Sequence, residues 1–563
     1  MQIIIPMSGF GERFFRAGYQ IPKALIELDG KPIIAHVIDM FPGEHDFLFI
    51  CNNEHLQNIT YRMEEILHEY CPTGKIIGIP PHKLGPVHAV LQVHHLIDME
   101  RPALINYCDF TCYWDWNDFK NFVVTTRCQG AIPAYKGFHP HSLGNTNYAY
   151  MQEQGGWVSD IQEKQPYTNV RMNEYASSGS YYFASGKLMI DALRSTIQKA
   201  LLVGGEYYVS LAYKALLEKK QPVAVYPLQH FMQWGTPDDV AEYNNWSSIF
   251  KRLIQPKAQK KLSQQAVIIP MAGLGSRFVQ EGYTTTKPLI PVSGKPMVMQ
   301  ATDDLPHASN YVFVLRQDMP GFETISQGLQ QSYPSVNIAS IENATEGQAC
   351  TALIGLNALK IHGNKEEMHI PSISSLITFG ACDNGVLYDD AAFQKLVNNL
   401  DIDVIVWGVR HHAHAKRHPQ MYGWIDEKEG VISCVSVKKP LRDPAIDPII
   451  IGTFTFRRAN DFRLVVDRLM TRNGRINNEF YLDSCINDAI DLGLRCHLFE
   501  VDHLLSWGTP NDLRTFEYWQ SCFHKWASHP YRLELDSRVP KDKQAELDTC
   551  YQADRPQRPV NCV

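Results

Sequence analysis

The sequence predicts an α/β protein made of two tandem domains, each with a mostly parallel mixed sheet that is flanked by helices. Two observations lead to this fold class. A stretch near the N-terminus recurs without a gap 264 residues further along the chain. Within each half, short continuous apolar runs alternate with helical patterns, which is typical of buried parallel strands connected by helices.

The repeat has the length of a domain. Residues 3–32 and 267–296 are identical at 16 of 30 positions. Shorter matched strings follow in the same order: 83–91 with 345–353, 106–109 with 380–383, 206–209 with 479–482, and 234–237 with 507–510. A period this long indicates a tandem duplication rather than a solenoid. The 563 residues therefore form two large domains, although a loose prior of one domain per ~150 residues would allow about four.

Apolar runs and turn residues place the main elements. The first strand of each half covers 3–5 or 267–269, and a glycine-rich turn follows it directly. A helix is predicted over 33–40, and another over 238–253, where Thr236 can cap the helix and Pro237 suits its first turn. Further strands are predicted over 47–50, 103–107, 311–314 and 375–379. In such sheets ligands bind beyond the carboxyl ends of the strands, where the glycine-rich turns fall.

The domain boundaries follow from these elements. We expect the first domain at 1–254, a polar and basic linker at 255–265, the second domain at 266–525 and a C-terminal tail at 526–563. The tail is polar and contains several prolines. We therefore expect it to lie over the surface or to be partly disordered.

Composition excludes several classes of protein. Apolar residues make up 44% of the chain and charged residues 20%, which is ordinary for a globular protein. The formal charge of −7 argues against nonspecific binding to nucleic acid or to anionic membranes. The 13 cysteines form no CxxC pair, and free thiols suit a reducing compartment. With no signal peptide and no run of about 18 apolar residues, we expect a cytoplasmic protein without a membrane or nucleic-acid partner.

A Gly-x-Gly-x-Arg turn follows the first strand of each half, at Gly9, Gly11 and Arg13 and again at Gly273, Gly275 and Arg277. Glycines let backbone N–H groups approach phosphate oxygens, and the arginine fork fits those oxygens. The alternative is a tight turn without a ligand. A dinucleotide-binding loop would need a third glycine where Phe14 and Phe278 stand, and the GxxxxGK pattern of a P-loop is absent.

Two further residue types recur in register with the glycine-rich turns. Lys23 and Lys287 each lie 14 residues after the first glycine. Such a lysine suits a phosphate or a transition-state charge, and the alternative is a solvated surface cation. Asp109 and Asp383 each end an apolar strand. Mg²⁺ prefers one or two carboxylates together with substrate phosphates, and the alternative role is a helix cap or turn.

These motifs together resemble the sugar-1-phosphate nucleotidyltransferases, the pyrophosphorylase family. The resemblance covers about 1–250 and 265–520 and includes the Gly-Lys-Pro strings, the Glu163–Lys164 pair and the late Gly-Thr-Pro strings. It is closest to the bacterial branch that activates capsule or lipopolysaccharide sugars and small phospho-alcohols such as phosphocholine. It implies two tandem Rossmann-like nucleotidyltransferase domains, a nucleoside triphosphate and a phosphorylated small molecule as substrates, and Mg²⁺ as cofactor. It also allows a homo-oligomer.

The resemblance implies roles for particular residues. Arg13, Lys23, Arg277 and Lys287 would be catalytic, and Asp109 and Asp383 would hold the metal. The nucleotide would be bound by Met7, Gly9, Gly11, Gly85, Met271, Gly273, Gly275 and Gly347. The acceptor would be bound by Glu163, Lys164, Gly179 and Lys439. Here Lys439 is matched with Lys164, and Lys438 stands where the first half has Glu163.

The sequence departs from the family at one metal position. Many members have a second metal-binding aspartate two residues before the late glycine, where this chain has Gln233 and Ser506. Magnesium would then rest on one carboxylate and the nucleotide phosphates.

Three functional hypotheses remain open. Both halves are active nucleotidyltransferases, with products used for surface polysaccharide precursors, or one half is catalytic and the other is a regulatory or structural binding domain. The third, a glycosyltransferase, would usually show an Asp-x-Asp string at a strand end, which neither half has.

Overall fold

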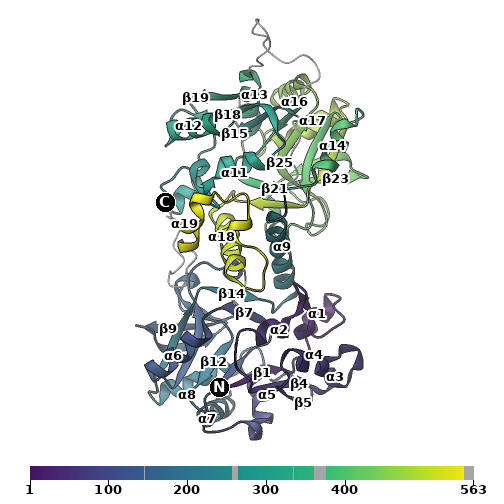
Figure 1. Ribbon diagram of the computed structural model, residues 1–563. Helices are drawn as coiled ribbons and strands as arrows, with labels where there is room; N and C mark the ends of the chain where they lie inside the picture. Colours follow the sequence, from purple (N-terminus) through teal and green to yellow (C-terminus); the bar gives the residue numbers. More distant parts are fainter. Residues whose placement is uncertain (145, 257–263, 334, 360–375, 551–563) are drawn as a thin grey trace. The chain divides into compact units, whose positions relative to one another are not determined.

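The computed structural model describes residues 1–144, 146–256, 264–333, 335–359 and 376–550. The chain divides into two compact units, whose elements are labelled in Figure 1. The first consists of Met1–Lys251, Tyr518–Arg532 and the segment that begins at Asp548, and the second of Arg252–Glu517 and Leu533–Leu547. Part of the predicted linker (257–263), the end of the predicted tail (551–563) and residue 375 of a predicted strand lie outside the described residues.

The first unit contains a ten-stranded sheet. In spatial order its strands are β11 (Tyr175–Ser177), β9 (Ala149–Gln154), β10 (Trp157–Glu163), β13 (Val223–Leu228), β8 (Gly130–Tyr135), β12 (Ser180–Phe183), β6 (Ala103–Asn106), β1 (Gln2–Met7), β4 (Phe47–Asn52) and β5 (Lys75–Ile79). Strands β10, β11 and β12 run opposite to β1, and the others run with it.

The second unit contains a nine-stranded sheet. Its strands are β19 (Val336–Ile341), β18 (Ala308–Arg316), β15 (Gln264–Pro270), β20 (Ile377–Phe379), β25 (Ile449–Phe456), β22 (Val404–Val409), β26 (Cys496–Glu500), β24 (Val431–Val437) and β23 (Gly423–Lys428). The order matches that of the first sheet read from β5, except that β25 takes the place of both β11 and β12. The mostly parallel mixed sheet predicted for each half is confirmed.

Helices connect the strands along both halves. Those of the first half are α1 (Glu12–Arg16), α2 (Ile33–Ile38), α3 (Asn53–Gln57), α4 (Met63–Tyr70), α5 (Pro86–Gln92), α6 (Trp116–Thr126), α7 (Gly186–Gln198), α8 (Tyr213–Glu218) and α9 (Pro237–Leu253). Helix α2 ends two residues before the predicted 40, and α9 begins one residue before the predicted 238 and ends at the predicted 253. No helix in the described part of the chain combines the length and the apolarity needed to cross a bilayer.

The helices of the second half follow the same plan. They are α10 (Ser276–Gln280), α11 (Met297–Asp304), α12 (Phe322–Ser332), α13 (Gln348–Ala358), α14 (Asp390–Asn398), α15 (Ala413–Arg417), α16 (Ala459–Thr471), α17 (Leu482–Asp491), α18 (Pro510–Lys525) and α19 (Gln544–Cys550). The boundary between the two units falls inside α18, after Glu517.

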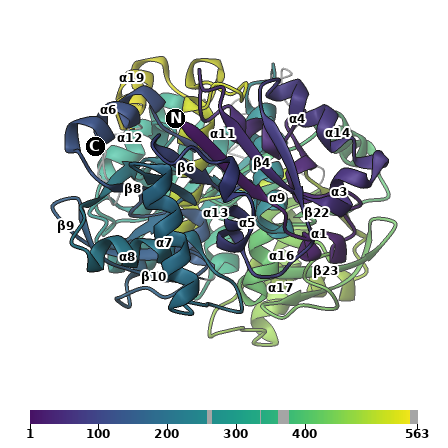
Figure 2. The same cartoon turned by 90° about the horizontal axis from the view of Figure 1, so that it is seen from below.

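Burial on both faces of the sheet explains why the sequence of strand β1 is apolar without interruption. Successive side chains of a strand point to opposite faces of the sheet. Ile4 belongs to one buried apolar cluster with Val87 of α5 and Leu193 of α7, two helices that lie together over one face in Figure 2. Ile3 and Ile5 point to the other face, and both are fully buried. The sheet is therefore covered on both faces, as parallel strands require.

Short two-stranded ribbons follow the central strands. They pair β7 (Phe110–Tyr113) with β14 (His230–Gln233), β21 (Asn384–Leu387) with β27 (His503–Ser506), β2 (Glu27–Leu28) with β3 (Lys31–Pro32), and β16 (Pro291–Val292) with β17 (Lys295–Pro296). The first two ribbons bring the late Trp-Gly-Thr-Pro strings back to the strand ends that carry Asp109 and Asp383.

The expectation that the tail follows the surface is wrong for residues 529–539. In the first unit, Tyr531 is fully buried, its ring lies 4.8 Å from that of Phe250, and its hydroxyl accepts a hydrogen bond from Gln520 at 2.7 Å. In the second unit, Arg538 is 3% exposed and forms an ion pair with Asp304 at 3.0 Å. These polar residues can be buried because each has a polar partner.

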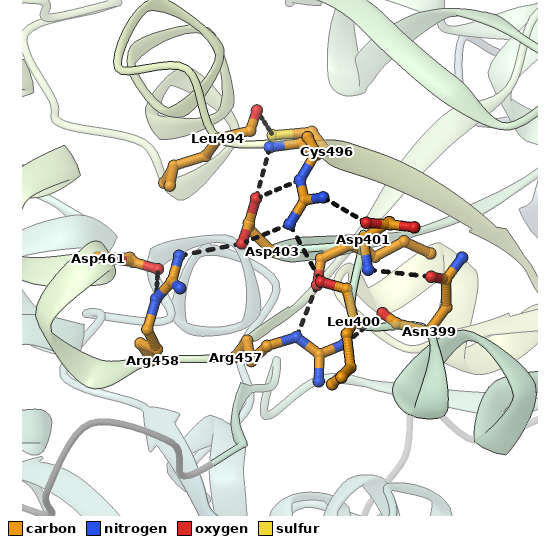
Figure 3. Close-up of polar contacts among 11 residues, drawn as sticks. Asn399, Leu400, Asp401, Asp403, Arg457, Arg458, Asp461, Leu494 and Cys496 are labelled. Carbon is orange, nitrogen blue, oxygen red and sulfur yellow. Dashed lines mark hydrogen bonds and ion pairs between the residues drawn. The ribbon is translucent and has the colours of Figure 1, made fainter.

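A carboxylate surrounded by arginines joins three strands of the second sheet (Figure 3). Asp403, just before β22, accepts hydrogen bonds from Arg495 at 3.0 Å and from Arg458 at 3.0 Å. Arg458 follows β25 closely, and Arg495 directly precedes β26. The neighbouring Arg457 donates to backbone carbonyls, including that of Ile402 at 2.7 Å. Every one of these guanidinium groups already has protein partners, so the cluster is structural.

Candidate active site

The glycine-rich turns lie between a central strand and a short helix in each unit. Gly11 and Gly275 precede α1 and α10 with φ of 68° and 63°, a conformation that favours glycine. A Cβ atom on Gly9 or Gly273 would meet no heavy atom within 4 Å. The space above both turns is therefore open to a ligand.

The arginines of these turns are exposed. Arg13 and Arg277 form no side-chain hydrogen bond or ion pair within the described ranges. Each lies one residue inside its helix and close enough to the following lysine to affect its charge. Both arginines are thus free to meet an anion.

Each predicted lysine contacts the predicted metal-binding aspartate. Lys23 Nζ lies 2.7 Å from Asp109 Oδ2, and Lys287 Nζ lies 2.5 Å from Asp383 Oδ2. Burial opposes the lysine charge, but the neighbouring carboxylate outweighs it and raises the pKa of both lysines above its ordinary value. Residues 86 to 96 positions apart in sequence therefore meet as charged pairs.

The late glycines explain why the Trp-Gly-Thr-Pro string recurs. The backbone N–H of Trp234 donates to the Asp109 carbonyl at 2.7 Å, and a Cβ on Gly235 would lie 3.2 Å from Asp109 Oδ2. The same geometry holds for Gly508, whose Cβ would lie 3.2 Å from Asp383 Oδ2. The glycine therefore leaves room beside the carboxylate.

The residues that replace the family's second aspartate, Gln233 and Ser506, are engaged in hydrogen bonds within the protein. Gln233 Nε2 donates to Asp239 at 2.7 Å, and its Oε1 accepts from the Tyr148 hydroxyl. Ser506 Oγ lies 3.3 Å from Asp512 in the equivalent place. Sequence reasoning missed Asp239 and Asp512, although both stand three residues after the threonine of the Gly-Thr-Pro strings and could have been found by extending the repeat.

The predicted base-pocket glycines are required by a close backbone approach. Gly85 has φ of 84°, and a Cβ there would lie 2.8 Å from the Tyr207 carbonyl oxygen. For Gly347, with φ of 138°, the clash would be with Phe480 at 2.5 Å. This approach lets Tyr207 N–H donate to the Leu84 carbonyl at 2.9 Å. Contact with a nucleotide base stays a prediction, as it does for the buried Met7 and Met271 at the strand ends.

The predicted acceptor residues of the first unit lie around Tyr208. Lys164 Nζ donates to the Tyr208 hydroxyl at 2.6 Å and lies over its ring. Glu163 accepts a hydrogen bond from Ser210 at 2.6 Å. Burial raises the pKa of Glu163 to about 7, although Ser210 and Lys164 oppose the shift. Gly179, with φ of 106°, links β11 to β12, and a Cβ there would lie 2.9 Å from Phe110.

The match of Lys439 with Lys164 is wrong. Lys164 follows β10 with φ of 60°, and its N–H donates to the Tyr148 carbonyl at 2.8 Å. Lys438 follows β24 with φ of 65°, and its N–H donates to the Tyr422 carbonyl at 2.9 Å. The counterpart of Lys164 is therefore Lys438, whereas Lys439 is exposed. Adjacent identical lysines leave the alignment of the repeat open, and the backbone contacts at the strand ends decide it.

A cavity in the second unit brings these residues together. It has a volume of about 240 Å³, and its lining includes Gly275, Arg277, Lys287, Asp383, Tyr422 and Asp512. In the first unit a hollow of about 570 Å³ lies outside α1, lined by residues such as Phe10, Glu12 and Lys83. None of the predicted catalytic residues lines this hollow of the first unit.

The carboxylates at the strand ends fit a magnesium ion whose coordination is completed by nucleotide phosphates. Within the described ranges, no three His, Cys, Asp or Glu side chains gather as a metal site. Asp109 and Asp383 each offer one carboxylate beside an open glycine-rich turn. Mg²⁺ is commonly held by one or two carboxylates and substrate phosphates, so the residues present fit that mode.

Comparison with known families defines the class of this protein. Residues 2–245 match the model of the nucleotidyl transferase family. The match to this family thus covers the first half of the chain and supports a nucleotidyltransferase enzyme. The second half repeats the sheet order and the paired lysine and aspartate of the first.

Particular relatives cover part of the chain. Bifunctional protein GlmU from Methanococcus vannielii is 23% identical over 285 residues, which are 50% of this chain and 61% of the relative. The chain thus spans about three fifths of that relative's length. The nucleoside-diphosphate-sugar pyrophosphorylase from Vibrio cholerae RC9 is 20% identical, covering 43% of this chain and 99% of its own, with a TM-score of 0.36. UDP-glucose pyrophosphorylase from Acinetobacter baumanii is 17% identical, covering 45% of this chain and 98% of its own, with a TM-score of 0.35.

Proposed function

We propose that each unit transfers a nucleotidyl group from a nucleoside triphosphate to the phosphate of a sugar phosphate or phospho-alcohol and releases pyrophosphate. One observation carries this proposal: an open glycine-rich turn, an exposed arginine and a lysine–aspartate pair are assembled at the same strand ends in both units. The family match over residues 2–245 supports the reaction class.

The reaction needs no nucleophile from the protein. A phosphate oxygen of the acceptor attacks the α-phosphorus in line, so a new P–O bond forms while the bond to pyrophosphate breaks. Arg13 and Lys23, and likewise Arg277 and Lys287, would bind the phosphates and neutralise the charge that develops on them. Asp109 and Asp383 would hold a magnesium ion, which would supply further charge neutralisation on the phosphates.

We propose surface polysaccharide precursor synthesis as the setting, in the cytoplasm, where nucleoside triphosphates are made. The support for this setting is the resemblance of the motifs to the branch that activates such sugars and small phospho-alcohols. Self-association into a homo-oligomer stays a prediction.

The proposal is tested by pyrophosphate release from the full chain, with the four common nucleoside triphosphates and a panel of sugar 1-phosphates and phospho-alcohols. Loss of one catalytic cation typically costs about 10²–10³-fold in rate. We expect Lys23→Ala and Lys287→Ala each to reduce one activity by about that factor and to spare the other. Lys199→Ala, in an exposed ion pair with Glu218, is the control. Absence of pyrophosphate release with every substrate pair would overturn the assignment.

The alternative is that one unit is catalytic and the other only binds nucleotide or sugar. It is favoured by one observation: Val437, rather than a carboxylate, stands at the counterpart of Glu163. Single Asp109→Ala and Asp383→Ala variants separate the two proposals. Two distinct losses of activity support two working sites, and an effect of only one variant supports the alternative.

A further inference from the structure

The acceptor region of the second unit has the same backbone frame as that of the first. Glu163 pairs across the sheet with Ala149, and at the equivalent place Val437 pairs with Gly423. The segment opposite is also matched: the N–H groups of Tyr207 and Phe480 donate to the Leu84 and Glu346 carbonyls, both at 2.9 Å. This register makes Asp483 the counterpart of Ser210, at a separation of 273 residues in both cases.

Three side chains differ together between these frames. In the first unit, the strand carries the carboxylate of Glu163, which accepts a hydrogen bond from Ser210 at 2.6 Å. In the second unit, the strand carries Val437, and the carboxylate is that of Asp483 in α17. The carboxylate has therefore moved from the strand to the opposite helix.

The third change makes room for the moved carboxylate. A Cβ on Gly423 would lie 2.3 Å from Asp483 Oδ2, a distance that real Cβ atoms essentially never show. The first unit has Ala149 at this position. Because loss of that methyl group and gain of Asp483 belong together, the second unit has kept a carboxylate between this strand pair and α17 rather than lost one.

Asp483 lies near Lys438 without contacting it. Lys438 Nζ donates to the Met421 carbonyl at 2.9 Å and lies 5.4 Å from the centre of the Tyr481 ring, as Lys164 lies over Tyr208. The Asp483 carboxylate has no hydrogen-bond or ion-pair partner among the described side chains. Burial raises the pKa of Asp483 to about 6, with Lys438 opposing the shift. An incoming hydrogen-bond donor would satisfy this half-buried carboxylate.

We propose that Asp483 and Lys438 form the acceptor site of the second unit, Lys438 binding the phosphate of a phosphorylated sugar or polyol and Asp483 binding one of its hydroxyl groups. A hydroxyl suits Asp483 better than a quaternary ammonium, because the face of the adjacent Tyr481 ring is already covered by Lys438. This inference rests on the proposed function. It makes the second unit a working transferase whose acceptor differs from that of the first.

The test uses the full chain carrying Lys23→Ala, so that turnover reports the second unit. Hydrogen bonds to charged groups predict a rise of about 10- to 100-fold in the acceptor KM for Asp483→Asn, while the KM for the triphosphate is unchanged. The matched control is Asp491→Asn on the same helix, an exposed carboxylate that pairs with Arg468. The probes are glucose 1-phosphate, glycerol 3-phosphate and phosphocholine.

A transplanted pocket extends the test. The triple variant Gly423→Ala, Val437→Glu and Asp483→Ser rebuilds the first unit's arrangement, and we expect it to restore acceptor use that Asp483→Ser alone loses. Unchanged acceptor KM in Asp483→Asn, or an equal change for phosphocholine, overturns the proposal. Calorimetric titration with glucose 1-phosphate distinguishes failure modes: binding that depends on Asp483 without turnover contradicts only the proposed reaction. If turnover occurs and the affinity for glucose 1-phosphate is the same with and without the Asp483 carboxylate, only the acceptor role of Asp483 is contradicted.

Discussion

Both units place lysines near carboxylates, but the lysine at the glycine-rich turn and the lysine beside the tyrosine ring are held in different ways. Lys23 touches Asp109 directly, so each neutralises the other in the free protein. Triphosphate oxygens could take over the lysine charge while a cation takes over the aspartate charge. By contrast, Lys164 is held by Tyr208, and Glu163 is held by Ser210. The acceptor side therefore keeps its two charged groups apart, with hydrogen-bonding capacity left for a ligand.

Glu163 should make the stability of the first unit depend on pH. Its pKa is raised from the ordinary 4.5 to about 7, mainly by burial, with Glu206 adding to the shift and Ser210 and Lys164 opposing it. A raised carboxyl pKa gives stability that is complete below about pH 4.5 and is lost as the pH rises through about 7. Glu163→Gln should therefore stabilise the protein at pH 8 by about 1–3 kcal/mol.

Thermal unfolding of the full chain at pH 5 and pH 8 measures this difference. The gain of Glu163→Gln over the unmodified protein should be clear at pH 8 and much smaller at pH 5. Glu69→Gln, an exposed residue of α4, is the control and should give the same small effect at both pH values. An equal effect of Glu163→Gln at both pH values would show that Glu163 is ionised in the folded protein throughout this range.

At the scale of elements, Asp403 should hold the edges of β22, β25 and β26 together. Burial disfavours its charge, but the hydrogen bonds and charges of Arg495 and Arg458 outweigh this and keep its pKa below the ordinary value. Asp403→Asn would remove the carboxylate that both arginines share, leaving Arg458 with Asp461 and Arg495 with Asp401. Because Arg458 is 37% and Arg495 52% exposed, water can replace part of the lost contact. The free energy of unfolding should therefore fall by about 1–3 kcal/mol.

Hydrogen exchange measured by mass spectrometry localises the effect. Asp403→Asn should reduce protection in β22 and β26 and spare the first sheet. The matched control is Asp401→Asn, which removes one contact of Arg495 from a side chain that is 86% exposed and should cost less than about 0.5 kcal/mol. Since a depressed carboxyl pKa gives stability that is lost on acidification through the lowered pKa, the two proteins should converge only well below the ordinary value of 3.8. A loss as large for Asp401→Asn would mean that Asp403 has no special role.

The elements themselves were largely predictable from sequence, whereas the register at their ends was not. Continuous apolar runs predicted β1, β4 and β6 because strands buried on both faces leave little choice of residue. The end of β24 could not be predicted from letters, since Lys438 and Lys439 are chemically identical and only the bond to the Tyr422 carbonyl selects one. Asp483 could not be predicted either, because its role depends on Val437 of β24 and Gly423 of β23, which the fold alone brings next to α17.

At the scale of the whole molecule, the first unit is completed by residues far away in the sequence. Tyr518 donates to the Phe231 carbonyl at 2.8 Å, and Ser521 lies 2.7 Å from His230. The Trp526 ring lies 5.2 Å from that of His36, beside α2. The sequence of α18 does not tell which core this helix joins. The first unit is therefore incomplete without residues 518–532.

Phe523 tests this dependence, because it lies in α18 and belongs to the first unit. Its side chain is fully buried, and its ring lies 5.8 Å from that of Tyr243 and 4.0 Å from that of His529. Phe523→Ala should cost about 3–5 kcal/mol through the cavity it leaves. The loss of hydrogen-exchange protection should appear in α9 and β14, although these elements lie some 270 residues earlier in the chain.

The control for this variant is Leu535→Ala, a side chain that is 57% exposed and belongs to the second unit. It should change stability by no more than about 0.5 kcal/mol. Turnover that depends on Lys23 should fall at elevated temperature in Phe523→Ala before turnover that depends on Lys287 does. If protection were instead lost only in β21 and β27, the end of α18 would belong to the core of the second unit, and residues 1–251 would form a complete first domain by themselves.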